Sequence, residues 1–192
     1  SGMAPLMIIG TVPLYNAFAV IVLSLLKPGQ RKMDKALLQK TLKGIVTNPI
    51  ILGIAAGFVW AILKIPQPEI LQKTVKNMAV LATPLGLMAM GASFEGKKAL
   101  GKLKPTLIAS ALKLVVLAAI FLPIAVWLGY RESELVAILV MLGSATTVSS
   151  FVMARNMGHE GILTSSIVMV TTLCSAFTLT GWLFLLKTLG LV

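Results

Sequence analysis

The stretch MLGSATTVSSFVMAR, residues 141–155, lies inside an apolar segment long enough to cross a membrane. Lipid forms no hydrogen bonds, so polar or irregular backbone at this depth is stable only against protein or a water-filled cavity. In transporters, helices that are interrupted near the middle of the membrane bind substrates and ions. The stretch therefore predicts an interrupted helix at a substrate site. Five of the seven residues from 144 to 150 carry hydroxyl groups and are its predicted lining: Ser144, Thr146, Thr147, Ser149 and Ser150.

A second interpretation of this stretch is close helix packing, which small and hydroxyl-bearing side chains allow in membranes. The last apolar segment has a polar stripe of its own, and such hydroxyls often bond only to their own helix. If the two segments pack together, both stripes face one cavity. The second stripe consists of Thr171, Thr172, Ser175, Thr178 and Thr180.

The composition indicates an integral membrane protein. The chain has 192 residues, of which 57% are hydrophobic and 12% are charged, and its mean hydropathy is +0.95. Soluble domains carry about 25% charged residues. The net charge of +11 lies in short loops and is explained by membrane orientation, so we expect no nucleic-acid partner. The single cysteine, Cys174, excludes an internal disulfide and is expected to be a small buried hydrophobe.

Six segments reach the roughly 20 residues that cross a bilayer, and together they form one membrane domain over residues 1–192. A basic amphipathic stretch, residues 31–43, is expected at the interface between the first two. The chain begins without the positively charged region of a signal peptide, and this abrupt start resembles a cut edge. The predicted spans are residues 4–26, 44–63, 70–94, 105–128, 133–155 and 162–187.

Loop charge predicts the orientation. The loop between the first two spans holds six basic residues against one acidic residue, and the loop between the third and fourth holds four against one. The loops on the other side are far less basic. Since positively charged loops stay in the cytoplasm, we expect the C-terminus outside.

Three ionisable residues are candidates for function. Lys113 lies about two turns inside the fourth span, where a charge suggests a functional site, although its long side chain could also reach back to the interface. Arg155 could attract an anion or act only as an orientation signal. His159 could couple transport to protons or be solvated without a role.

Catalysis is not expected. Ser144 and His159 could be imagined as a serine nucleophile and its base, but His159 lies beyond the end of the helix and out of hydrogen-bond reach. The chain shows no carboxylate pair and no metal-ligand cluster. We therefore predict a protein that is no enzyme and has no cofactor or metal.

Several motifs resemble one transporter family. The run from Ser144 to Arg155, followed by residues 171–175, resembles the end of auxin efflux carriers, a family that includes plant PIN proteins and bacterial malate permease-like carriers. Residues 12–17, residues 48–51 and residues 82–85 with Gly91 resemble earlier signatures of that family.

The resemblance implies an all-α fold of ten membrane helices in two inverted repeats, as in bile acid–sodium symporters. The six spans would be helices five to ten, residues 44–187 one five-helix repeat, and residues 141–155 the ninth helix, which crosses its counterpart beside the substrate. The chain departs from the family in two places: the crossing helix has no proline, and Thr180 stands where a proline is common.

The implied function is secondary transport of a small organic anion, such as an auxin-like acid or a dicarboxylate, by alternating access in the cell membrane. Lys113 and Arg155 would supply positive potential near the path. The expected partners are membrane lipids, the anion, and either the missing N-terminal repeat or a second copy in a homodimer. The alternative is a half-size membrane scaffold or oligomerisation module that transports nothing itself.

Overall fold

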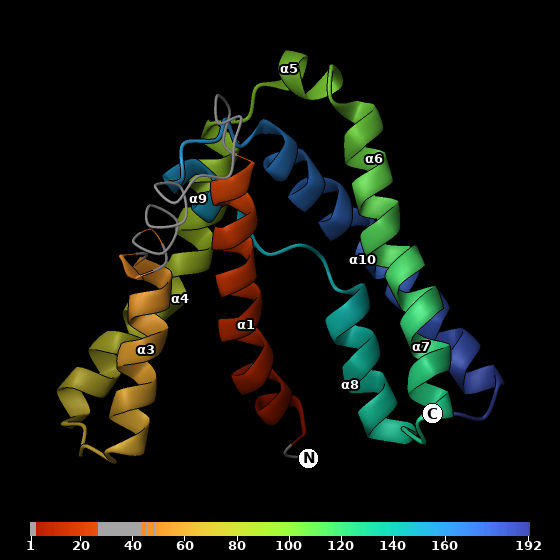
Figure 1. Ribbon diagram of the computed structural model, residues 1–192, viewed down its shortest axis with the longest axis horizontal. Coiled ribbons are helices and arrows are strands. Elements are labelled where there is room, and N and C mark those ends of the chain that lie inside the picture. The colour runs from red at the N-terminus through yellow and green to blue at the C-terminus, as the bar shows by residue number, and fades with distance from the viewer. Residues whose placement is uncertain (1–2, 27–43, 45, 48) are drawn as a thin grey trace.

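A computed structural model describes residues 3–26, 44, 46–47 and 49–192 of the chain, and the regular structure in these residues is entirely helical (Figure 1). The predicted all-α membrane fold is thereby confirmed. The predicted amphipathic stretch 31–43 lies outside the described residues. The elements are α1 (Met3–Leu25), α3 (Pro49–Ile62), α4 (Glu69–Ala92), α5 (Gly96–Leu100), α6 (Leu103–Ala111), the π-helical turn η1 (Leu112–Val116), α7 (Leu117–Trp127), α8 (Glu132–Gly143), α9 (Val148–Asn156) and α10 (Ile162–Thr188).

Within the described residues, three helices are long and apolar enough to cross a membrane: α4, the continuous helix Leu103–Trp127, and α10. The pair α8 and α9 forms a fourth such span with a bend of about 40°. The shorter apolar helices Thr11–Leu23 and Ile51–Ile62 lie in α1 and α3. The bounds of α1, α4, Leu103–Trp127, the α8–α9 pair and α10 lie within two residues of predicted spans, α3 begins five residues later than predicted, and α5 lies in a predicted loop. The count of six membrane crossings stays a prediction.

The connections fall on two opposite sides of the molecule (Figure 1). The short helix α5 and the turn between α9 and α10 lie on one side. The described start of α1, the α3–α4 and α7–α8 connections and the C-terminus lie on the other. A salt bridge of 3.2 Å between Lys102 and Glu160 joins the two connections of the first side. Successive described connections therefore alternate between the two sides, while the side that faces the cytoplasm stays a prediction.

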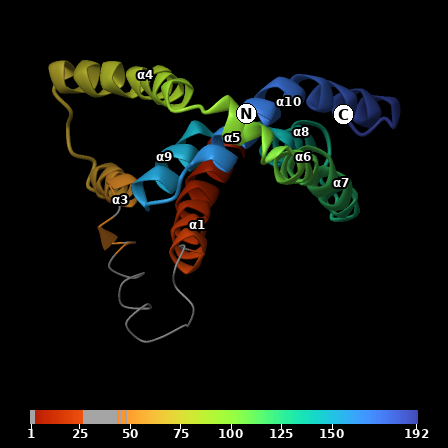
Figure 2. The same ribbon diagram turned by 90° about the horizontal axis from the view of Figure 1, so that it is seen from above.

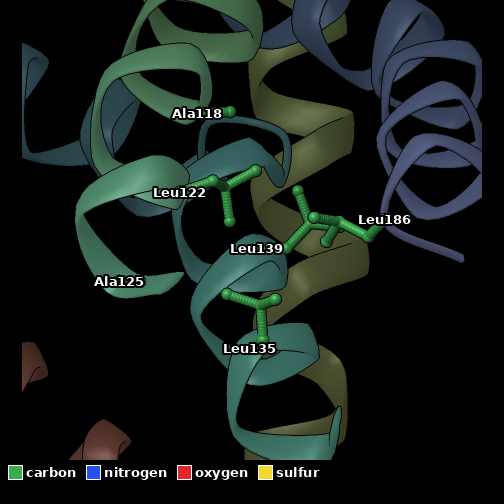
Figure 3. Close-up of a cluster of buried hydrophobic side chains, with 6 residues drawn as sticks. All are labelled: Ala118, Leu122, Ala125, Leu135, Leu139 and Leu186. Carbon is green, nitrogen blue, oxygen red and sulfur yellow. The ribbon is translucent and has the colours of Figure 1, made fainter. Parts of the chain in front are cut away.

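The main apolar core joins α7, α8 and α10 (Figure 3). Leu135 and Leu139 on α8 are fully buried, and Leu186 of α10 closes the cluster. The remaining members come from one face of α7: Ala118, Leu122 and Ala125. This core packs α8 against α7 and α10 to within one turn of the end of α8 at Gly143.

The helices α3 and α4 lie on the far side of α1 and α9 from this core (Figure 2). Only 6% of the most apolar 18-residue segment of α4 is buried inside the described part of the protein. A second, smaller cluster joins α4 to the rest through Met90, Phe151 and Val168. At Gly86 an added Cβ would lie 2.8 Å from Cγ1 of Val148, so the glycine allows α4 to approach the start of α9.

Cys174 corrects one prediction, because its side chain is exposed on α10 rather than buried. Residues 172–174 of α10 are all exposed and lie between the buried Thr171 and the part of α10 that packs on α8 through Leu179 and Leu186. Nothing in the described part of the chain covers the cysteine there.

Candidate functional site

The span at residues 132–156 is interrupted in its middle, as the hydroxyl-rich stretch predicts. The helix α8 ends at Gly143, α9 begins at Val148, and the link between them is not helical. Its first and last residues are extended: Ser144 has φ −69° and ψ 157°, and Thr147 has φ −73° and ψ 147°. The interruption needs no proline, because side chains of other elements bond to the backbone on either side of it.

Lys113 binds the end of α8. Its Nζ donates hydrogen bonds to the carbonyl oxygen of Leu142 at 3.0 Å and to that of Met141 at 3.4 Å. The last carbonyls of a helix lack partners within the helix and carry partial negative charge, so an ammonium group there is stabilising. Of the two alternatives for Lys113, the structure therefore contradicts the one in which the side chain reaches back to the interface, because the ammonium group lies at the interruption.

The backbone around Lys113 is itself unusual. Lys113 lies in the π-helical turn η1, and Nε1 of Trp182 on α10 donates to the carbonyl oxygen of Leu114 at 3.2 Å. Such turns occur often at functional sites, where they interrupt the regular helical hydrogen bonds. Trp182 satisfies a carbonyl in this turn and connects it to α10.

Thr171 supports the link between the two half-helices. Its Oγ1 accepts a hydrogen bond from the N–H of Thr146 at 3.1 Å and donates to the carbonyl oxygen of Ile167 at 2.7 Å. Its side chain is fully buried. Of the five hydroxyls in the α10 stripe, this is the one that reaches the interruption. The other four bond only within α10: Thr172, Ser175, Thr178 and Thr180.

The start of α9 has no side-chain cap. The hydroxyl of Thr147 is 2.9 Å from that of Ser149, and Oγ of Ser150 donates to the carbonyl oxygen of Thr147 at 2.7 Å. The first N–H groups of a helix lack partners within the helix and carry partial positive charge, which favours an anion. All five predicted lining residues thus lie at the interruption, three in the link and two in the first turn of α9.

Arg155 and His159 lie at the other end of α9, about 10 Å along the helix axis from its start at 1.5 Å per residue. Nη1 of Arg155 donates to the carbonyl oxygen of Glu160 at 3.1 Å. Nε2 of His159 lies 2.9 Å from the carbonyl oxygen of Leu23 in α1. The expectation of a solvated His159 is therefore wrong, because the ring is half-buried and binds the end of α1. Neither residue is at the interruption.

Two residues at the site, Gly86 and Trp182, had no assigned role in the sequence, and neither had the buried Asn16 of α1. Asn16 is 2% exposed in α1, which contacts both α8 and α9. Its Nδ2 donates to the carbonyl oxygen of Val12 at 2.8 Å, and its Oδ1 has no partner among the described residues. A polar residue within an apolar span is the signal that could have marked Asn16. No group of three or more metal-binding side chains occurs in the described part of the chain.

Residues 7–183 match the family of membrane transport proteins. The matched region takes in the interrupted helix and the elements that support it. The chain belongs to this family, that of the auxin efflux carriers. Among curated proteins and solved structures, none matches the chain. Membership confirms the resemblance of the sequence motifs and makes this auxin efflux carrier relative a membrane-embedded transport protein.

Proposed function

We propose that this auxin efflux carrier relative binds a small organic anion at the interruption between α8 and α9, and moves it across the cell membrane by alternating access. The anion would be an auxin-like acid or a dicarboxylate. One observation carries the proposal. The end of α8 presents partial negative charge to the link and the start of α9 partial positive charge, but a charged side chain, that of Lys113, neutralises only the end of α8.

The electrostatics of the link favour an anion. The end of α8 would present negative carbonyls, but the ammonium group of Lys113 lies 3.0 Å from the nearer one. The positive start of α9 has no side-chain cap. The net charge at the link is therefore positive, and in a medium of low polarity a net positive charge attracts an anion strongly. The hydroxyls of Thr147 and Ser149 lie beside it and share one hydrogen bond, which leaves one hydroxyl proton as an additional donor.

The transport cycle follows from the position of the site. A substrate bound at an interrupted helix near the membrane midplane can be exposed to either side when one group of helices moves against another. We infer that residues 44–187 form one of two inverted repeats, and that the second comes from a missing N-terminal repeat or another copy of the chain. In this cycle the protein catalyses no covalent reaction. We propose that the C-terminus lies outside. His159 remains a candidate for proton coupling.

Transport of radiolabelled malate and indole acetate into liposomes tests the proposal, with the protein reconstituted at its native length. The double variant Thr147→Val, Ser149→Ala removes both hydroxyls at the start of α9. A hydrogen bond to an anion is worth about 1.5–3 kcal/mol, so we expect the apparent KM of the transported acid to rise roughly 10- to 100-fold.

The matched control is Thr178→Val, Thr180→Val, because those hydroxyls bond only within α10. It should leave the KM unchanged. Uptake that is identical in wild type and the Thr147, Ser149 double variant would contradict the assignment of the site.

A further inference from the structure

A second site lies away from the interruption. A cavity of about 380 Å³ lies beside α5, between α6 and the first half of α10. Its lining is almost entirely hydrocarbon. The residues that surround it are Phe94, Gly96, Ala99, Leu100, Leu103, Thr106, Ser166, Met169 and Val170.

The two hydroxyls of this lining are occupied. Oγ1 of Thr106 donates to the carbonyl oxygen of Lys102 at 2.8 Å, and Oγ of Ser166 donates to that of Ile162 at 2.9 Å. The cavity therefore offers a ligand only apolar contact. Among its lining residues, Leu100 is 66% exposed, so the cavity is open to the surroundings of the protein beside α5.

The rim of the cavity is the chain segment 95–104, which supplies four of the lining residues and carries four lysines against one glutamate. Glu95 binds Lys98 at 2.8 Å, and this hydrogen bond, together with the carboxylate charge, raises the pKa of the Lys98 ammonium. Glu160 on the neighbouring connection forms a salt bridge of 3.2 Å with Lys102. The two remaining lysines, Lys97 and Lys104, are exposed and form no ion pair with any residue that the structure describes.

We propose that this cavity binds an acyl chain of an anionic phospholipid, whose phosphate group is held by the lysines at the rim, Lys97 and Lys104. Loop charge predicts that this side of the protein faces the cytoplasm, where membranes carry their anionic lipids and basic residues near the surface attract them. A second copy of this chain fits the rim poorly, because each copy carries a net charge of +11. The proposal is independent of the transported substrate.

Native mass spectrometry of the detergent-purified protein tests this, with phosphatidylglycerol and phosphatidylcholine of identical acyl chains as probes. We expect wild type to bind phosphatidylglycerol more tightly. Each lysine near an anionic headgroup contributes about a factor of five, so Lys97→Gln, Lys104→Gln should weaken phosphatidylglycerol binding roughly 25-fold and leave phosphatidylcholine binding unchanged. The variant Ala99→Leu fills the cavity and should weaken the binding of both lipids.

The charge-matched control is Lys64→Gln, Lys187→Gln on the opposite side of the molecule, which should keep the preference for phosphatidylglycerol. Because Lys97 and Lys104 are exposed, their replacement leaves the fold intact even if Ala99→Leu does not fold. The proposal is overturned if wild type binds both lipids equally, or if the control removes the preference and the rim variant keeps it. Spectra that show a second copy of the chain bound, and displaced by Ala99→Leu, would overturn it as well.

Discussion

The two half-helices that meet at the interruption are stabilised in different ways. The end of α8 rests on a fully buried apolar core and is closed by the ammonium group of Lys113. The start of α9 has no side-chain cap and is positioned by its contact with Gly86 of α4 and by the bond between Thr171 and the link. A charged side chain thus closes the end of α8, whereas packing and one hydrogen bond to the link position the start of α9 and leave its first N–H groups for a ligand.

Removal of the charge at α8 should have the largest effect. In Lys113→Met the apolar stem remains, but the carbonyls of Leu142 and Met141 lose their partner. Hydrogen bonds to charged groups contribute about 1.5–3 kcal/mol, and we expect a loss of that size in the free energy of unfolding, measured by thermal or denaturant unfolding in detergent. Anion binding should also weaken, because the end of α8 would then be negative.

The control for this variant is Lys104→Met, which removes an exposed lysine without a salt bridge in the described residues. It should change stability by less than about 0.5 kcal/mol. Equal stability of the two variants would mean that Lys113 does not support α8.

A methyl group at Gly86 tests how packing positions α9. Gly86→Ala places a Cβ 2.8 Å from Cγ1 of Val148, which is too close for the two helices to stay as they are. Overpacking costs about 1–3 kcal/mol, and the start of α9 should shift away from α4. Substrate affinity and unfolding midpoint should both fall.

Gly91 is the matched glycine in the same helix, because an added Cβ there meets nothing within 4 Å. Gly91→Ala should be neutral or slightly stabilising, since alanine favours helix over glycine by about 1 kcal/mol. In the double variant Gly86→Ala, Val148→Ala the clash is absent, so substrate affinity and unfolding midpoint should return toward the wild-type values. If both glycine variants behave alike, the contact between α4 and α9 does not position the site.

The sequence predicted the interruption because five hydroxyls within seven residues conflict with a lipid environment, and this conflict is local. It predicted the helices because each is a long apolar run. The partner of Lys113 could not be predicted. A lysine near a helix start can reach back to the interface or stay inside the span, and only the position of α8 decides between the two. The exposure of Cys174 and the contact of His159 with Leu23 likewise depend on how distant helices pack, which no local pattern contains.

Replacement of Thr171 tests the link itself. Thr171→Val keeps the shape of the side chain but removes the acceptor of the Thr146 N–H. Hydrogen bonds between membrane helices average about 0.6 kcal/mol and reach about 1.7 kcal/mol, and the full burial of Thr171 favours the upper end. Thr172→Val, which loses only a bond within α10, should unfold like wild type. Hydrogen exchange of the Thr146 amide should accelerate only in Thr171→Val.

The smallest effect is expected at the far end of α9, where His159 connects the helix to α1. A carbonyl only accepts hydrogen bonds, so Nε2 of His159 carries the proton that binds Leu23. His159→Ala should cost about 0.5–1.5 kcal/mol of unfolding free energy, while His159→Gln retains a donor and should lose less. If the two variants unfold identically, the bond does not stabilise α9.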